Sequence, residues 1–263
     1  MPQPVKVDLE QWERDGFVIV PDILSPDEAA VAARILEERL PADGPPPGLP
    51  DVHNGRKTLI REHTDPRLSN LAGHPRLIEA VEQIMGPCFL IQGTAAPVIT
   101  YKSPPGEENF DLGYHVDWPH NPSEPGDERC MNCCLHLGTV ESGGGALMVR
   151  PGSHRLVAEN LNDPVLKQRM FDQDFDGFPG LSEPIEACVT SGSGVFFHAF
   201  LVHDRSENVL DVPRRVVFTH YRSFDGNQQR SEWAATASQR FVDHQIETMD
   251  DRLKHLCGLD ESR

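Results

Sequence analysis

The sequence has no long apolar run and comparatively few basic residues. No stretch approaches the roughly 20 apolar residues of a membrane-spanning helix, and the opening MPQPVKVDLEQWERDGF lacks the apolar segment of a secretory signal. Lys and Arg number 24 against 41 Asp and Glu, so the formal net charge is -17. We therefore expect neither a membrane nor a nucleic acid as a partner, because binding to nucleic acid depends on a basic surface.

Cysteine is also scarce and shows no pattern of paired spacing. The six cysteines do not form the framework of a small secreted domain, so we expect a reduced, cytoplasmic protein. Cys130 and Cys133 have the CxxC spacing of zinc and redox sites, but no second pair follows at the spacing of a zinc finger. The segment CMNCCLHLG alternates as a strand does, which favours buried strand cysteines over zinc.

The first third of the chain carries helix signals. Ser25 can cap a helix, Pro26 suits its first position, and Glu28 completes a capping box. We predict a helix from there to about residue 40. A second helix is predicted from His74-Pro75 to the stop signal Met85-Gly86-Pro87.

From residue 88 onward, short apolar segments alternate with Gly, Pro and Asp clusters, which is typical of strands. The predicted strands cover residues 88–92, 95–102, 129–138, 145–150, 194–202 and 214–222. The long connections cover residues 103–113, 119–128 and 155–184, and we expect them to wall a site, the last being partly helical. The 263 residues suit one domain, with a helical part at about 1–87, a β-core at about 88–225 and a tail at about 226–263.

The segment GYHVDW places His115 and Asp117 two residues apart. In a strand, residues i and i+2 point to the same side, so both side chains can reach one metal ion. His203, at the end of the strand-like run Val195–Val202, is the expected third ligand. Two imidazoles and a carboxylate form the facial triad of non-haem Fe(II) oxygenases, which leaves coordination positions open.

The chain resembles the phytanoyl-CoA dioxygenase-like family of Fe(II)/2-oxoglutarate oxygenases over nearly its whole length. The motifs that carry this resemblance are WERDGFVIVPDILSPDEAA, YKSPPG, GYHVDW, GGGALMVRPGSHR, HDRSEN and PRRVVFTHY. The resemblance implies a mainly β fold with flanking helices around a double-stranded β-helix, which is a jelly-roll or cupin-like core. It also implies iron, 2-oxoglutarate and dioxygen, and hydroxylation of a small organic metabolite with release of succinate and CO2.

A co-substrate with a distal carboxylate requires a cation in a dry pocket, and the planar fork of arginine suits that role. Arg214 matches the arginine of the family, whereas Arg215 is expected to face the other way as a surface charge. By resemblance, further contacts to 2-oxoglutarate come from Ser206, Lys57, Cys134 and Val98. Ser206 stands one residue later than the usual serine, whose place Arg205 takes, and Arg61 competes with Lys57.

His198 is a rival for the third metal ligand. It lies five residues before His203, and odd spacing in a regular strand places two residues on opposite faces. Asn208 and Arg214 fall into the register of the family with His203, which favours His203. His154, in the PGSH turn, is expected to fix that turn.

Two other functions stay open at this point. One is a cupin-like metalloenzyme that does not use 2-oxoglutarate, and the other is a catalytically silent binding protein of the same fold. Asp117 favours hydroxylation over halogenation, because a halogenase of this type lacks the carboxylate. Desaturation, epoxidation and cyclisation use the same triad, and the sequence specifies neither the substrate nor the oligomeric state.

Overall fold

The computed structural model describes residues 3–44, 56–58, 65–90, 96–103, 113–117, 130–175, 177–223 and 243–259. The predicted connection 119–128, most of 103–113 and the side chains of Lys57 and Arg61 lie outside these residues. Within them, no helix is long and apolar enough to span a membrane.

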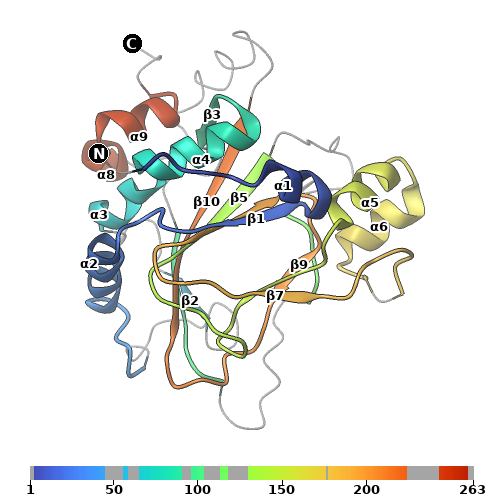
Figure 1. Cartoon of the computed structure of the whole chain (residues 1–263), viewed down its shortest axis with the longest axis horizontal. Coiled ribbons are helices and arrows are strands. Elements are labelled where there is room, and N and C mark those ends of the chain that lie inside the picture. The colour runs from blue at the N-terminus through green and yellow to red at the C-terminus, as the bar shows by residue number, and fades with distance from the viewer. Residues whose placement is uncertain are drawn as a thin grey trace.

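Two antiparallel sheets form the β-core (Figure 1). The larger sheet has the order β1 (Phe17–Val20), β8 (Gly194–His198), β5 (Cys130–His136), β10 (Arg214–Ser223), β4 (Ala96–Thr100) and β2 (Arg56–Thr58), with β3 (Cys88–Leu90) paired to the end of β10. The smaller sheet consists of β7 (Ile185–Ala187), β6 (Leu147–Val149) and β9 (His203–Arg205). This arrangement confirms the predicted double-stranded β-helix.

The side chains of the larger sheet divide between its two faces. On β5, Cys134 points between the sheets and its neighbours Cys133 and Leu135 point outward. The apolar residues between the sheets form the inner cluster: Phe17, Val98, Cys134, Val140, Ala146, Leu147, Val149, Ala187, Val189, Val195, Phe197, Leu201 and Val216. Burying one face of each strand in this way fixes the register, because a shift by one residue would turn every side chain over.

Helices cover the outer face of the larger sheet. They are α1 (Leu9–Asp15), α2 (Pro26–Glu37), α3 (Pro66–Ser69), α4 (Pro75–Met85), α8 (Asp243–Thr248) and α9 (Asp251–Leu256), with the 3-10 turn Asn70–Gly73 after α3. On the other side of the core lie α5 (Ser153–Asn160) and α6 (Pro164–Phe171), as Figure 1 shows. The partly helical nature of 155–184 is thereby confirmed.

The capping box of α2 forms as predicted. The Glu28 backbone N–H donates to the Ser25 hydroxyl at 3.3 Å, and the Ser25 N–H donates to the Glu28 carboxylate at 2.8 Å. These two bonds satisfy N–H groups that the first helical turn leaves without an intrahelical partner. The helix ends at Glu37, three residues before the predicted end, while α4 covers the predicted range from Pro75 to Met85.

Each of the six predicted strands is present, five of them shorter than predicted and β10 one residue longer, but one boundary was wrong. The predicted strand 194–202 ends at His198, where the Leu201 N–H donates to the His198 carbonyl at 2.9 Å and turns the chain. His203 therefore begins β9 in the smaller sheet instead of ending a strand of the larger one. The short strands β2, β7 and β9 did not stand out in the apolar pattern.

The cysteines of the CxxC segment are buried strand residues, as predicted. Cys130, Cys133 and Cys134 lie on β5 with relative exposures of 3% or less, and all three are free thiols. Burial raises the pKa of the Cys133 thiol well above its ordinary value. The division of the chain into a single domain stays a prediction.

Gly192 allows two segments of the fold to approach closely, and its substitution should destabilise the protein. Its φ is +83°, and a Cβ there would lie 2.3 Å from the carbonyl oxygen of Leu24. We expect Gly192→Ala to lower the free energy of unfolding by about 2 kcal/mol or more, from strained backbone and steric clash together. Urea unfolding followed by circular dichroism measures this. Gly138→Ala is the matched control, since no heavy atom lies within 4 Å there, and equal stability of the two variants would contradict the prediction.

Candidate metal centre

Backbone hydrogen bonds bring the two metal-binding segments together. His115 and His203 form an antiparallel bridge in which each N–H donates to the carbonyl of the other at 3.0 Å. The Asp117 N–H donates to the Ala199 carbonyl at 3.1 Å. The segment 113–117 is thus fixed against the chain between β8 and β9, with His115 and Asp117 on the same side.

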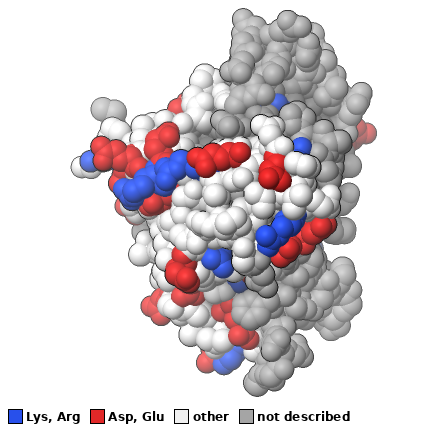
Figure 2. All heavy atoms as spheres, turned by 90° about the vertical axis from the view of Figure 1, so that its right-hand side faces the viewer, with Lys and Arg blue, Asp and Glu red and all other residues white. Residues whose placement is uncertain are grey.

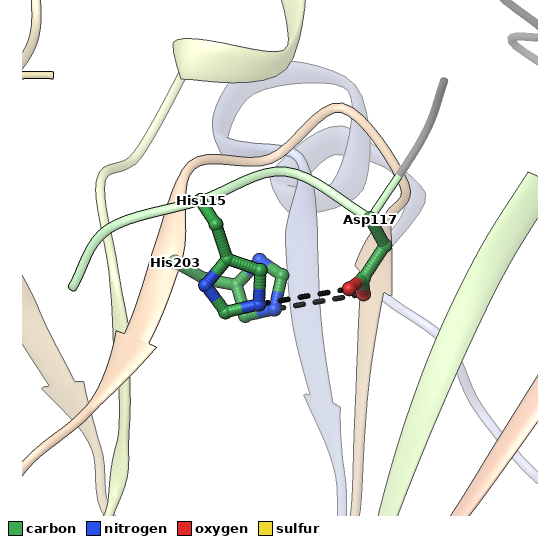
Figure 3. A group of neighbouring side chains, drawn as sticks. All are labelled: His115, Asp117 and His203. Carbon is green, nitrogen blue, oxygen red and sulfur yellow. Dashed lines mark ion pairs between the residues drawn. The ribbon is translucent and has the colours of Figure 1, made fainter. Parts of the chain in front are cut away.

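The three predicted ligands converge on one point (Figure 3). His115 Nε2 lies 3.6 Å from Asp117 Oδ1, and His203 Nε2 lies 3.5 Å from Asp117 Oδ2. One ligand atom from each residue lies within 4.8 Å of the others, and the described residues contain no other such group of His, Cys, Asp and Glu. The printed separations of 3.6 and 3.5 Å are shorter than the roughly 4.2 Å that two bonds of about 2.1 Å can span, so Asp117 can share an ion with either histidine.

Each histidine is held in the tautomer that a metal requires. The Nδ1 atom of His115 is 3.1 Å from the Gly113 carbonyl, and that of His203 is 2.9 Å from the Leu201 carbonyl. A carbonyl oxygen only accepts hydrogen bonds, so each Nδ1 carries the proton. Each Nε2 then presents its lone pair to the metal position.

The three side chains of the centre differ in how far they are exposed. The side chain of His203 is 6% exposed, that of His115 is 17% exposed and that of Asp117 is 29% exposed. The intervening Val116 turns away and packs under α5 and α6, in a cluster that includes Phe200 and Val202. Exposure thus rises from His203 to Asp117, and three ligands from one side are the set that a facial triad requires.

His198 points away from this centre. Its Nδ1 accepts a hydrogen bond from the Phe200 N–H at 3.0 Å, and its ring lies 6.1 Å from that of Trp12 and 5.5 Å from that of His154. The sequence argument placed His198 and His203 on opposite faces of one regular strand, and it was wrong because the strand ends at His198. The geometry still favours His203 as the third ligand, since His203 lies beside Asp117. His154 packs closely on Gly16, so it supports the junction of α1 and β1. That it fixes its own turn stays a prediction.

Arg214 is a buried cation facing the inner cluster. It is 3% exposed, and its Nη2 donates to Cys134 Sγ at 3.1 Å. Burial lowers the pKa of Arg214 below its ordinary value, and the charge of Arg205 acts in the same direction. Among the described residues, Nε of Arg214 has no hydrogen-bond partner and no carboxylate pairs with the guanidinium.

The interior around Arg214 is electrically positive. Burial, followed by the charge of Arg214, lowers the pKa of His136 to about 3, so this imidazole is neutral at physiological pH. A buried charge without a partner is costly, so a site of this kind favours an anionic ligand. Arg215 faces the opposite way and pairs with Glu37 of α2 at 2.5 Å.

The other predicted co-substrate residues occupy different environments. Val98 and Cys134 both lie in the inner cluster beside Arg214. Lys57 lies on β2, paired in register with Ile99 of β4, but its side chain lies outside the described residues. The hydroxyl of Ser206 is buried and has no hydrogen-bond partner among the described residues.

Sequence reasoning missed two residues next to the triad. The amide nitrogen of Asn132 donates a short hydrogen bond to Asp117 Oδ2, and Nδ1 of His220 lies 2.5 Å from Asn132 Oδ1. These residues are directly opposite each other on β5 and β10. Strand alternation could have placed both between the sheets, but no local signal relates them to Asp117.

Comparison with known proteins decides the family. Residues 12–216 match the family described as Phytanoyl-CoA dioxygenase (PhyH). The chain belongs to the phytanoyl-CoA dioxygenase family. It is accordingly an Fe(II)/2-oxoglutarate-dependent dioxygenase, which decides against the cupin-like and silent alternatives.

Individual members of the phytanoyl-CoA dioxygenase family are distant relatives. Ectoine dioxygenase of Bordetella parapertussis is 27% identical over 245 residues, covering 82% of this chain and 75% of that protein. Peroxisomal phytanoyl-CoA dioxygenase of Rattus norvegicus is 24% identical, covering 81% and 67%.

Solved structures share the fold. The epimerase SnoN in complex with Fe3+, alpha ketoglutarate and nogalamycin RO has a TM-score of 0.63 at 21% identity, covering 82% of each chain. EctD from S. alaskensis with 2-oxoglutarate and 5-hydroxyectoine has a TM-score of 0.55 at 20% identity, covering 82% of this chain and 74% of that one.

Loss of any of the three ligands should remove the metal centre. Changing even a group behind a ligand costs roughly 10- to 100-fold in metal affinity. We therefore expect His115→Ala, Asp117→Ala and His203→Ala each to weaken Fe(II) binding by about 100-fold or more and to abolish turnover. Anaerobic Fe(II) titration by calorimetry measures the affinity. His198→Ala is the control, and loss of Fe(II) in this variant with retention in His203→Ala would show that the wrong histidine was assigned.

Proposed function

We propose that the protein hydroxylates a small organic metabolite, with His115, Asp117 and His203 holding Fe(II) and Arg214 binding the distal carboxylate of 2-oxoglutarate. The observation that carries this proposal is the buried Arg214, which faces the interior behind the triad without a carboxylate partner among the described residues. Bound iron and 2-oxoglutarate supply the oxidising chemistry, with dioxygen as the oxidant and succinate and CO2 as by-products.

The residues of this chain would bind and orient the reactants. The fixed tautomers of His115 and His203 keep both Nε2 lone pairs on the metal position. The planar guanidinium of Arg214 can bind a carboxylate through two parallel hydrogen bonds, which sets the direction of the co-substrate. The inner cluster excludes water from this pocket and so strengthens the charge interaction.

Other residues have supporting roles in the proposal. Val98 and Cys134 form apolar walls beside the guanidinium. Lys57 is given no part in this site, because its register partner Ile99 belongs to the cluster on the outer face of the sheet. Arg205 is two residues after His203 on β9 and so shares its side of the strand. The buried Ser206 hydroxyl has no hydrogen-bond partner among the described residues, so we assign both Ser206 and Arg205 a part in binding the co-substrate.

We further propose a small, soluble substrate that does not carry coenzyme A. Relatives named ectoine dioxygenase support a small metabolite. The net charge of -17 disfavours large polyanions. On the face in Figure 2, the described acidic and basic side chains lie side by side, without a continuous basic surface. Five free thiols among the described residues support a reducing, cytoplasmic location.

The co-substrate assignment predicts different effects for two adjacent arginines. Arg214→Ala should weaken 2-oxoglutarate binding by about tenfold or more, because a charged hydrogen bond contributes roughly 1.5–3 kcal/mol. Arg215→Ala should change this affinity little, since Arg215 pairs with Glu37 on the outer face. Anaerobic titration of 2-oxoglutarate into the Fe(II)-loaded proteins, followed by the metal-to-ligand absorption band, compares the two. Equal affinity in Arg214→Ala and wild type would contradict the assignment.

A metabolite screen tests the reaction itself. With Fe(II), 2-oxoglutarate and dioxygen, we expect a small metabolite to stimulate succinate formation at least severalfold and to gain one oxygen atom by mass spectrometry. The panel should include ectoine, free amino acids and an acyl-CoA, with Asp117→Ala as the inactive control. Stimulation by the acyl-CoA alone would overturn the proposed substrate class.

A further inference from the structure

Side chains from three segments form a hydrogen-bonded chain that begins at Asp117 of the metal centre and ends at His220. Asp117 accepts a hydrogen bond at Oδ2 from the Asn132 amide nitrogen, and Asn132 Oδ1 faces Nδ1 of His220 at 2.5 Å. Asn132 is 3% exposed, so water contributes little to satisfying its amide. Because Asn132 and His220 are partners in the β5–β10 ladder, the backbone fixes their relative position.

Donor and acceptor chemistry determines the direction of these bonds. An ionised carboxylate only accepts, so the amide group nearest Asp117 is the NH2 of Asn132. The amide oxygen then faces His220, and that oxygen also only accepts. His220 therefore donates from Nδ1, and it holds the Asn132 amide in the single orientation that can donate to Asp117.

We propose that Asn132 and His220 are positioning residues that keep Asp117 as a ligand through one oxygen. The hydrogen bond engages Oδ2, the oxygen nearer His203, so in this proposal Oδ1, the oxygen nearer His115, is the one that binds the metal. Without it, both oxygens of Asp117 are available and the carboxylate can take a second coordination position. The 2-oxo acid needs two positions, so a carboxylate bound through both oxygens competes with it. This inference rests on the proposed Fe(II)/2-oxoglutarate function.

The decisive experiment compares two 2-oxo acids. 2-Oxoglutarate carries a distal carboxylate and pyruvate lacks one, but both chelate iron in the same way. Arg214→Ala should therefore weaken the binding of 2-oxoglutarate and leave that of pyruvate unchanged. Asn132→Leu and His220→Leu should weaken both by about tenfold or more, the range for changes behind a metal ligand. The readout is the metal-to-ligand absorption band of anaerobic, Fe(II)-loaded protein.

Two further variants separate positioning from general damage. His220→Gln restores an N–H donor toward Asn132, and we expect it to regain most of the affinity lost in His220→Leu. Thr219→Val is the matched control, because Thr219 is buried on the same strand but points to the opposite face, opposite Cys133. It should bind both acids as the wild type does. If Asn132→Leu does not fold, the comparison of His220→Leu with His220→Gln still decides.

The outcomes distinguish this inference from the function on which it rests. If the wild type develops no absorption band with 2-oxoglutarate, both fail. If the wild type binds both acids and His220→Leu binds them equally well, only the positioning role is overturned. A loss that affects 2-oxoglutarate but spares pyruvate in His220→Leu also overturns it, since that pattern belongs to the distal carboxylate.

Discussion

The backbone pairing between His115 and His203 is the interaction on which the site depends. The two residues exchange hydrogen bonds at 3.0 Å, and the Asp117 N–H adds a third bond to Ala199. Because His203 belongs to the smaller sheet and His198 ends a strand of the larger one, this pairing fixes a short segment between both sheets. Side chains from two distant parts of the chain then meet at one point. Loss of the pairing would release His115 and Asp117 together, so the geometry of the triad depends on these backbone hydrogen bonds.

Polar groups between the sheets are arranged in two ways. Asp117, Asn132 and His220 satisfy one another, which removes most of the cost of burying them. Arg214 is satisfied only in part, by a thiol. A neutral His136 beside it shows how strongly the interior disfavours additional positive charge. The protein therefore keeps its metal-side network complete and its co-substrate side incomplete, which suits a ligand that supplies its own carboxylate.

Much of this could be predicted from sequence where a local rule applies. The capping box at Ser25 and Glu28 and the helix beginning at Pro75 follow from nearest-neighbour chemistry, and both are present. The placement of His115 and Asp117 on the same side of the chain follows from strand periodicity. The turn after His198 was missed because its residues are apolar and continue the strand pattern. The contact from Asn132 to Asp117 was not predictable either, since the two residues are 15 positions apart and no local spacing rule relates them.

Strand β10 links the two ends of the proposed co-substrate pocket. Arg214 stands at its first residue and His220 six residues later, and both face the interior. At about 3.3 Å per residue, their Cα atoms are roughly 20 Å apart. The side chain of Arg214 extends into the interior from one end of this interval. The hydrogen-bonded chain from His220 through Asn132 to Asp117 starts at the other end. The centre of β10 pairs on both sides, with β4 and β5, so its length cannot change without disrupting the larger sheet. In the proposed site, the spacing between the candidate metal ligands and Arg214 is thus set by sheet geometry.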